Sequence, residues 1–143
     1  MKTIESIKLC ISEVEETLTS IKEIKNGGTL TQAEQNKLKA DDVVLWINKA
    51  EITDSKRATF IVAKIMSPNS SGKADNRNAF RLLRAYIDIL TIKSYDDVKL
   101  LNLLAKIEDN FVNKGWKFEM VREAELDTSS NRTTWSFEIS KTL

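Results

Sequence analysis

The amino-acid sequence predicts an α+β fold: a mostly antiparallel sheet of four to five strands, covered on one face by two long helices. Three observations lead to this prediction. Apolar residues recur at helical spacing near the N-terminus and again after residue 97, and they alternate with polar residues in the last quarter of the chain. At 143 residues, without a visible linker, we expect a single domain over 1–143, with a helical part over 1–42 and a sheet with its central helix over 43–143.

The first element is an amphipathic helix over residues 4–24. Its apolar positions alternate between spacings of three and four and comprise Ile4, Ile7, Ile11, Val14, Leu18 and Ile21. Thr3 can cap its start, and Asn26 to Gly28 supply residues that commonly end a helix. We expect this helix to lie on the domain's own sheet, with Cys10 as a small packing residue, although three heptads would also suit a coiled coil between two chains.

A short surface helix and two strands follow. Thr31 and Glu34 have the spacing of a capping box, which predicts a helix through about Ala40. The compact apolar run from Val43 to Ile47 is rich in strand formers and predicts a buried strand. A second strand is expected over 57–66, with Phe60 and Val62 on one face and Ile61, Ala63 and Ile65 on the other.

The middle of the chain contains a polar loop, a long strand and a helix. Residues 67–78 hold the only proline and no large apolar side chain, so they predict a loop. The third strand, over 80–92, is long enough to suggest a bulge or an extension past the sheet edge. Ser94 and Asp97 then cap a helix that Gly115 ends. Its expected apolar stripe comprises Val98, Leu101, Leu104, Ala105, Ile107, Phe111 and Val112.

The last quarter predicts an antiparallel hairpin with one wet face. Trp116, Phe118 and Met120 alternate with Lys117, Glu119 and Val121. After a turn over 127–131, the apolar series Thr133, Trp135, Phe137 and Ile139 alternates with polar residues. We expect the aromatic residues to belong to the core rather than to a ligand site.

Composition excludes several classes of function. Twenty-two basic and twenty-one acidic residues give a net charge of +1, which provides no overall field for attracting nucleic acid or an anionic membrane. The chain has no histidine and one cysteine, so histidine-based catalytic triads, the usual zinc sites and an internal disulfide are ruled out. Carboxylate-only metal chemistry and lysine or tyrosine chemistry remain open. No apolar run is long enough to cross a bilayer and no signal segment is visible, so we expect the mature chain to begin at Met1 and to stay in the cytoplasm.

Two motifs resemble catalytic or phosphate-binding sites only in part. Gly72 and Lys73 suggest a phosphate loop, but Ser67 stands at the first glycine position and Ala74 at the hydroxyl position. Asp88, Asp97 and Lys99 resemble a magnesium nuclease site, which leaves a small nuclease as a third hypothesis. However, Asp97 and Lys99 open a helix, where acidic residues complement the helix dipole.

A basic cluster supports a second hypothesis. The cationic side chains around the loop and the third strand are interleaved with Phe80 and Tyr86, as in sheets on which RNA bases stack. The cluster comprises Arg57, Lys73, Arg77, Arg81 and Arg84. The alternative function is therefore an RNA-binding or regulatory αβ module that uses the basic third strand. The near-neutral net charge argues against it, and the same cations would also suit a solvated rim or a protein interface.

From about Val44 to Leu143 the chain resembles the tail terminator, or tail completion, proteins of long-tailed bacteriophages. The resemblance lies in the order of elements: strands LWINKAEI and RATFIVAKI, the loop ending SGKADNRNAFRL, the strand RAYIDILTIKS, the helix DDVKLLNLLAKIEDNFVNKGW, and the hairpin from KFEMVREAELD to RTTWSFEISK. The N-terminal helix fits the usual start of the family, whereas residues 26–42 match least.

The resemblance implies a structural virion protein with no enzymatic activity, no cofactor and no metal. Such proteins assemble as hexameric rings that cap the tail tube, end its polymerisation and join the tail to the capsid connector or stopper protein. The expected location is the virion tail, assembled in the host cytoplasm. The expected partners are further copies of the chain, the tail tube protein and the connector, with neither a membrane nor a specific nucleic acid.

The polar loop supplies the predicted interface residues. Its length and its charges of both signs favour a binding loop that becomes ordered against a neighbouring subunit or the tail tube. The candidate interface residues are Lys73, Asp75, Arg77 and Arg81. A flexible hairpin tip without a partner is the alternative.

Overall fold

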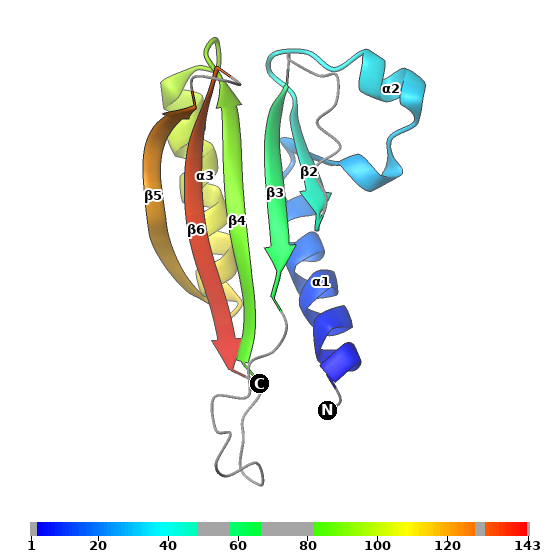
Figure 1. Cartoon of the computed structure of the whole chain (residues 1–143), viewed down its shortest axis with the longest axis vertical. Helices are drawn as coiled ribbons and strands as arrows, with labels where there is room; N and C mark the ends of the chain where they lie inside the picture. The colour runs from blue at the N-terminus through cyan, green and yellow to red at the C-terminus, as the bar shows by residue number, and fades with distance from the viewer. Residues whose placement is uncertain (1–2, 49–57, 67–81, 128–130, 143) are drawn as a thin grey trace, which may run out of the picture.

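The computed structural model describes residues 3–48, 58–66, 82–127 and 131–142. Within these ranges the chain forms α-helices, a short 3₁₀ helix and a sheet (Figure 1). In chain order, the elements are α1 (Thr3–Thr19), β1 (Ile24–Asn26), η1 (Gly27–Thr29), α2 (Gln32–Asn36), β2 (Val43–Ile47), β3 (Thr59–Ile65), β4 (Leu82–Ile92), α3 (Asp97–Asn113), β5 (Lys117–Asp127) and β6 (Arg132–Thr142).

The described strands form one mixed sheet in the order β1-β2-β3-β4-β6-β5. The β1–β2 and β2–β3 pairs are parallel, whereas β3–β4, β4–β6 and β5–β6 are antiparallel. The α+β class is therefore confirmed, but the described sheet has six strands rather than four to five, and two of its pairings are parallel. The sequence did not predict β1 because a strand of three residues is too short to show an alternating pattern.

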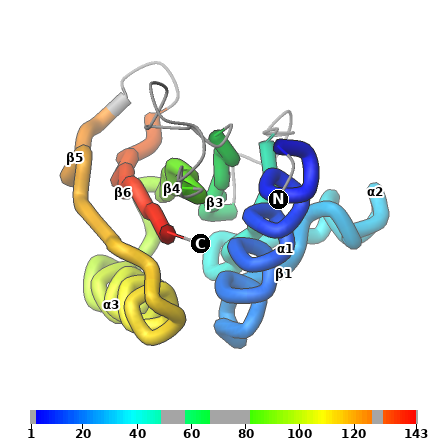
Figure 2. The backbone as a smooth tube through the Cα atoms, turned by 90° about the horizontal axis from the view of Figure 1, so that it is seen from below, coloured from blue at the N-terminus to red at the C-terminus, as the bar shows by residue number. Residues whose placement is uncertain are grey.

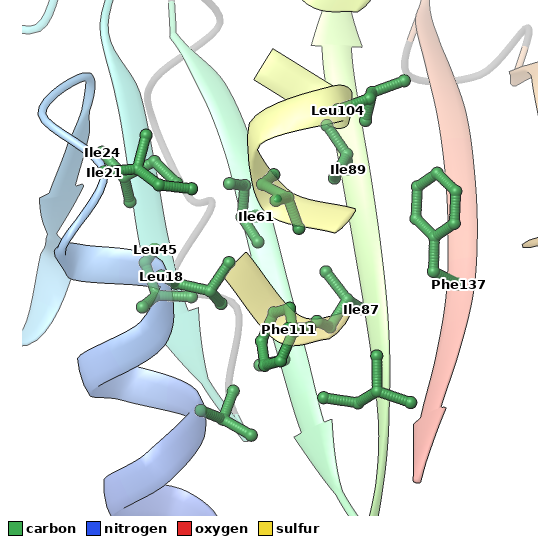
Figure 3. Packing of buried hydrophobic residues seen from close by; sticks show 14 of the residues in the cluster. Leu18, Ile21, Ile24, Leu45, Ile61, Ile87, Ile89, Leu104, Phe111 and Phe137 are labelled. Atoms are coloured by element: carbon green, nitrogen blue, oxygen red, sulfur yellow. The ribbon is translucent and has the colours of Figure 1, made fainter. Parts of the chain in front are cut away.

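Both long helices cover the same face of the sheet (Figure 2). The main core lies between them and the strands, and Figure 3 shows Leu18 of α1, Phe111 of α3 and Ile87 of β4 converging there. Along β4, every second side chain from Leu83 to Thr91 is buried on this face. The predicted hairpin is also confirmed, because β5 and β6 pair antiparallel and Phe137 and Ile139 are buried.

Helix α1 is shorter than predicted and is rotated relative to its expected seam. It ends at Thr19 rather than at residue 24, and its buried positions are Ser6, Cys10, Val14, Thr17 and Leu18. Ile4 is 62% exposed and Ile7 and Ile11 are half-buried, so the expected seam is wrong for the first half of the helix. A repeat of seven residues drifts by about 20° per heptad around a straight helix, which carries these isoleucines away from the core. Cys10 is buried, as predicted.

Helix α3 begins two residues later than the predicted cap at Ser94 implies. Asp96 is the N-cap, and its carboxylate accepts hydrogen bonds from the backbone N–H groups of Val98 and Lys99. Gly115, with φ of +88°, follows the helix end as predicted. The broad predicted stripe is wrong in part, because the buried residues are Leu100, Leu103, Leu104, Ile107 and Phe111. Val98, Leu101, Ala105 and Val112 are exposed instead.

The opposite face of the sheet carries a small second core over β2 and β3. It comprises Leu38, Val44, Trp46, Ala58 and Phe60, with Leu30 packed against it. The segment over 27–38 covers this core, and the capping box of Thr31 and Glu34 that starts α2 is confirmed, although α2 ends at Asn36 rather than Ala40. Gly27 lies directly on Trp46: a Cβ there would come within 2.8 Å of two indole carbons.

Arg132 joins the small core to β4. Its guanidinium lies 4.7 Å from the centroid of the Phe60 ring and donates hydrogen bonds to the carbonyl oxygens of Ala58 and Leu90. Burial lowers the pKa of this guanidinium. The charged group is thus held by backbone acceptors and an aromatic face.

The irregularities of the sheet lie in β5 rather than in β4. From Leu82 to Ile92, β4 pairs without interruption with β6, so the bulge predicted for this strand is absent from its described part. In β5 the register shifts between Met120 and Arg122 and again before Glu125, and Ala124 adopts a φ of 38°. The predicted loop over 67–78 and the start of the predicted third strand lie outside the described residues. No helix in the described part of the chain is long and apolar enough to span a membrane.

Candidate interaction surface

The four predicted interface residues, Lys73, Asp75, Arg77 and Arg81, lie outside the described residues. The same holds for Ser67, Gly72 and Ala74 of the partial phosphate motif, and for Arg57 and Phe80 of the basic cluster. Their assignment as a subunit or tail-tube interface therefore stays a prediction.

The residues of the hypothetical magnesium site are placed on different sides of the sheet. Asp88 lies in β4 on the face opposite to the helices, with Val62 and Ser136 as its register neighbours. Lys99 belongs to α3 on the other face, and its Nζ lies 3.9 Å from Asp41 Oδ1. Asp97 occupies the first turn of α3. Among the described residues, no group of three acidic or cysteine side chains could hold a metal ion.

Of the basic cluster, Arg84 is the described cation, and it has a partner within the sheet. Its Nη2 lies 2.9 Å from Glu138 Oε1 on β6, and it also donates to the hydroxyl of Tyr86. Burial opposes the charged form, but the hydrogen bond and the charge of Glu138 together with the contributions of Tyr86 outweigh it, so the pKa of the guanidinium is raised. An RNA phosphate would have to compete with Glu138 for this group.

Exposed apolar side chains gather at one end of the sheet, where α3 lies beside β5. Eight large hydrophobic side chains are exposed among the described residues, and six of them belong to these two elements. They are Val98, Leu101, Val112, Met120, Val121 and Leu126. This concentration makes the α3 and β5 end of the sheet the candidate interaction surface, since exposed apolar residues are normally scattered singly.

The part of this surface on α3 has helical periodicity. Val98, Leu101, Ala105 and Val112 follow at spacings of three, four and seven, which places them on one face with Glu108 between the last two. We call these five residues the α3 stripe. The side of α3 that faces α1 is different, because there Lys106 bonds Glu23 at 2.7 Å and Asn110 donates to Ser20. The α3 stripe therefore points away from α1.

Strand β5 continues the surface next to the α3 stripe. Met120 pairs in register with Phe137 and Leu126 with Thr133, so both side chains project on the helix-covered side of the sheet. A cavity of about 240 Å³ separates the start of α3 from the hairpin and is lined by Leu100, Leu126 and Trp135, among others. The indole Nε1 of Trp135 has no hydrogen-bond partner among the described residues.

The charges around this surface are mainly acidic. Lys117 pairs with Glu119, and Arg122 with Glu125, within β5 itself. Asp97, Glu108, Asp109 and Glu123 form no ion pair with another described residue, and the same holds for two cations, Lys93 and Lys114. A partner for this surface would therefore combine apolar side chains with cations.

Sequence reasoning missed this surface because it placed the stripe residues in the core. The available signal was the width of the predicted α3 stripe, which covers more of the helix than one core contact can bury. No protein-family model and no curated protein matches this chain.

Proposed function

We propose that this protein is a structural virion protein that caps the tail tube of a long-tailed bacteriophage as a ring. The ring, a homohexamer, would end tube polymerisation and join the tail to the capsid connector or stopper protein. The observation that carries the proposal is the concentration of exposed apolar side chains on α3 and β5, which suits a protein that works by association with copies of itself.

The order of the described elements also supports the proposal. A long N-terminal helix, β2, β3, β4, a central helix and a closing hairpin follow one another as in the family that the sequence resembles. The alternative, an RNA-binding or regulatory αβ module, has less support because Arg84 of its basic strand is bound to Glu138.

Mixing the protein with the tail tube protein tests the proposal directly. Polymerising tubes should stop at shorter lengths when the protein is present, and electron microscopy should show rings at tube ends. Replacing Pro68 to Asn76 by a two-residue turn should abolish capping, because it removes Lys73 and Asp75 from the predicted interface. Normal capping by this variant would show that the loop is only a connector, and unchanged tube lengths with the unaltered protein would contradict the proposed function.

A further inference from the structure

We propose that copies of this protein associate head to tail, with the outward face of α1 from one copy packed antiparallel on the α3 stripe of the next. The face on α1 consists of Ile4, Lys8 and Ile11, which we call the α1 stripe. The inference rests on the self-assembly part of the proposed function and is independent of the tail tube.

The α1 stripe is the apolar part of α1 that the protein itself leaves uncovered. Ile4 is exposed, Ile11 is half-buried, and a groove of about 510 Å³ runs along the helix past Lys8 and Ile11. Lys8 forms no ion pair with another described residue. At the N-terminal end of this groove, isoleucines flank a cation that no described carboxylate pairs, which suits the acidic, apolar α3 surface, whereas Glu15 and Glu16 line the groove further along the helix.

The two stripes lie at opposite ends of the helix layer. Asn26 of β1 donates a hydrogen bond to Glu15, so the side of α1 that carries the α1 stripe faces the β1 end of the sheet. The α3 stripe lies at the β5 end, and the two helices stand between these ends (Figure 2). Two different patches on opposite sides of one protomer are what a heterologous contact needs, and such contacts form a ring when the rotation from copy to copy closes.

The direction of packing follows from an arrangement within the protomer. Asn110 contacts Ser20 while Lys106 contacts Glu23, so α1 and α3 run antiparallel beside each other. A copy placed next to the first by rotation about an axis parallel to the helices would present its α1 to the neighbouring α3 in the same antiparallel sense. The contact between copies would thus have the same antiparallel arrangement of α1 and α3 that is found within each copy.

The register follows from charge. When Lys8 is opposite Glu108 in an antiparallel pair, Ile4 meets Val112 and Ile11 meets Ala105. The antiparallel register joins the apolar residues and pairs Lys8 with Glu108, while Glu15, which accepts a hydrogen bond from Asn26 of its own protomer, comes opposite Leu101.

Disulfide trapping of single-cysteine additions tests the contact. An equimolar mixture of the Ile4→Cys and Val112→Cys proteins should give a cross-linked dimer under mild oxidation, whereas either variant alone should give little. The native Cys10 does not interfere because it is buried. Equal cross-linking by one variant alone would overturn the proposal, since it would show a twofold contact between identical stripes.

Charge reversal gives an independent readout by sedimentation or light scattering. Lys8→Glu and Glu108→Lys should each weaken self-association by about tenfold, and the double variant should recover most of it. Lys22→Glu and Lys64→Glu are the matched controls at exposed positions outside the proposed contact and should have little effect. Absence of both cross-linking and rescue, with tube ends still capped, would reject this contact alone. Cross-linking without capping would keep the contact and reject the proposed function.

Discussion

The two faces of the sheet are stabilised in different ways. On the helix-covered face, side chains from α1, α3 and the strands from β2 to β6 form one continuous core (Figure 3). On the opposite face, buried hydrophobic packing is confined to β2 and β3, where the segment over 27–38 covers Val44, Trp46 and Phe60. The other part of that face carries Arg84, Tyr86 and Glu138, which are half-buried and bonded to one another.

This difference separates the contacts on which the stability of the whole domain depends from those that form a smaller, local core. The main core joins segments from both ends of the sequence, so losing one of its large side chains should affect the whole cooperative unit. The small core depends on close contact between a short irregular segment and one tryptophan, so it is sensitive to added volume as well as to lost volume.

The largest effect is expected for Phe111→Ala in the main core. Phe111 is fully buried and its ring packs against those of Trp116 and Phe118, with centroids 5.8 Å and 6.3 Å away. Truncation should lower the free energy of unfolding by about 3–5 kcal/mol, measured by urea denaturation. The neighbouring Val112→Ala, at a position 52% exposed, is the control and should cost less than about 0.5 kcal/mol. Similar losses for both variants would contradict the assignment of buried and exposed faces to α3.

A smaller effect is expected for Gly27→Ala in the small core. The added Cβ would lie 2.7 Å from the carbonyl oxygen of Leu45 as well as against the Trp46 indole. Because the backbone oxygen belongs to a central strand and cannot move freely, we expect a loss of about 1–3 kcal/mol and a changed Trp46 fluorescence. A Cβ at Gly28 would have its nearest neighbour, Asn26 Oδ1, at 3.4 Å, so Gly28→Ala should leave the free energy of unfolding nearly unchanged. A neutral Gly27→Ala would show that the small core is loosely packed.

The smallest expected effect is a pH dependence of the free energy of unfolding, which arises from the buried thiol of Cys10 in α1. Burial, with a further contribution from Glu13, raises the pKa of Cys10 to about 12. The unfolded thiol titrates near its ordinary pKa of about 8.5, so above that pH the unfolded state loses a proton that the folded state keeps. The free energy of unfolding should therefore fall by about 1 kcal/mol between about pH 9 and pH 10. Cys10→Ala should lack this component, and identical pH profiles for the two proteins would show that Cys10 is accessible.

Elements with strong local signals could be predicted from the sequence. The capping box of Thr31 and Glu34, the apolar run of β2 and the alternation in the closing hairpin each determine their own structure locally, and all three were confirmed. The alternation in β3 also placed Phe60 and Ile61 correctly on opposite faces of the sheet.

The remaining features depend on what each element packs against. Helical spacing identified α1 and α3, but Ile4 and Leu101 satisfy that spacing and still lie outside the core, since a stripe does not reveal how much of it a partner covers. The parallel pairing of β1 with β2 has no local signal for the same reason. The candidate surface on α3 and β5 emerges only when these misplaced apolar residues are located together in space.

The irregular course of β5 has a consequence for solubility. This eleven-residue strand ends the described sheet on one side, and a regular edge of that length would template the addition of further strands. Its two register shifts and the positive φ of Ala124 interrupt the row of backbone donors and acceptors, while Arg122 and Glu125 place charge beside the interruption. These interruptions and charges therefore oppose edge-to-edge addition of strands at β5, beside the exposed apolar side chains of the same strand.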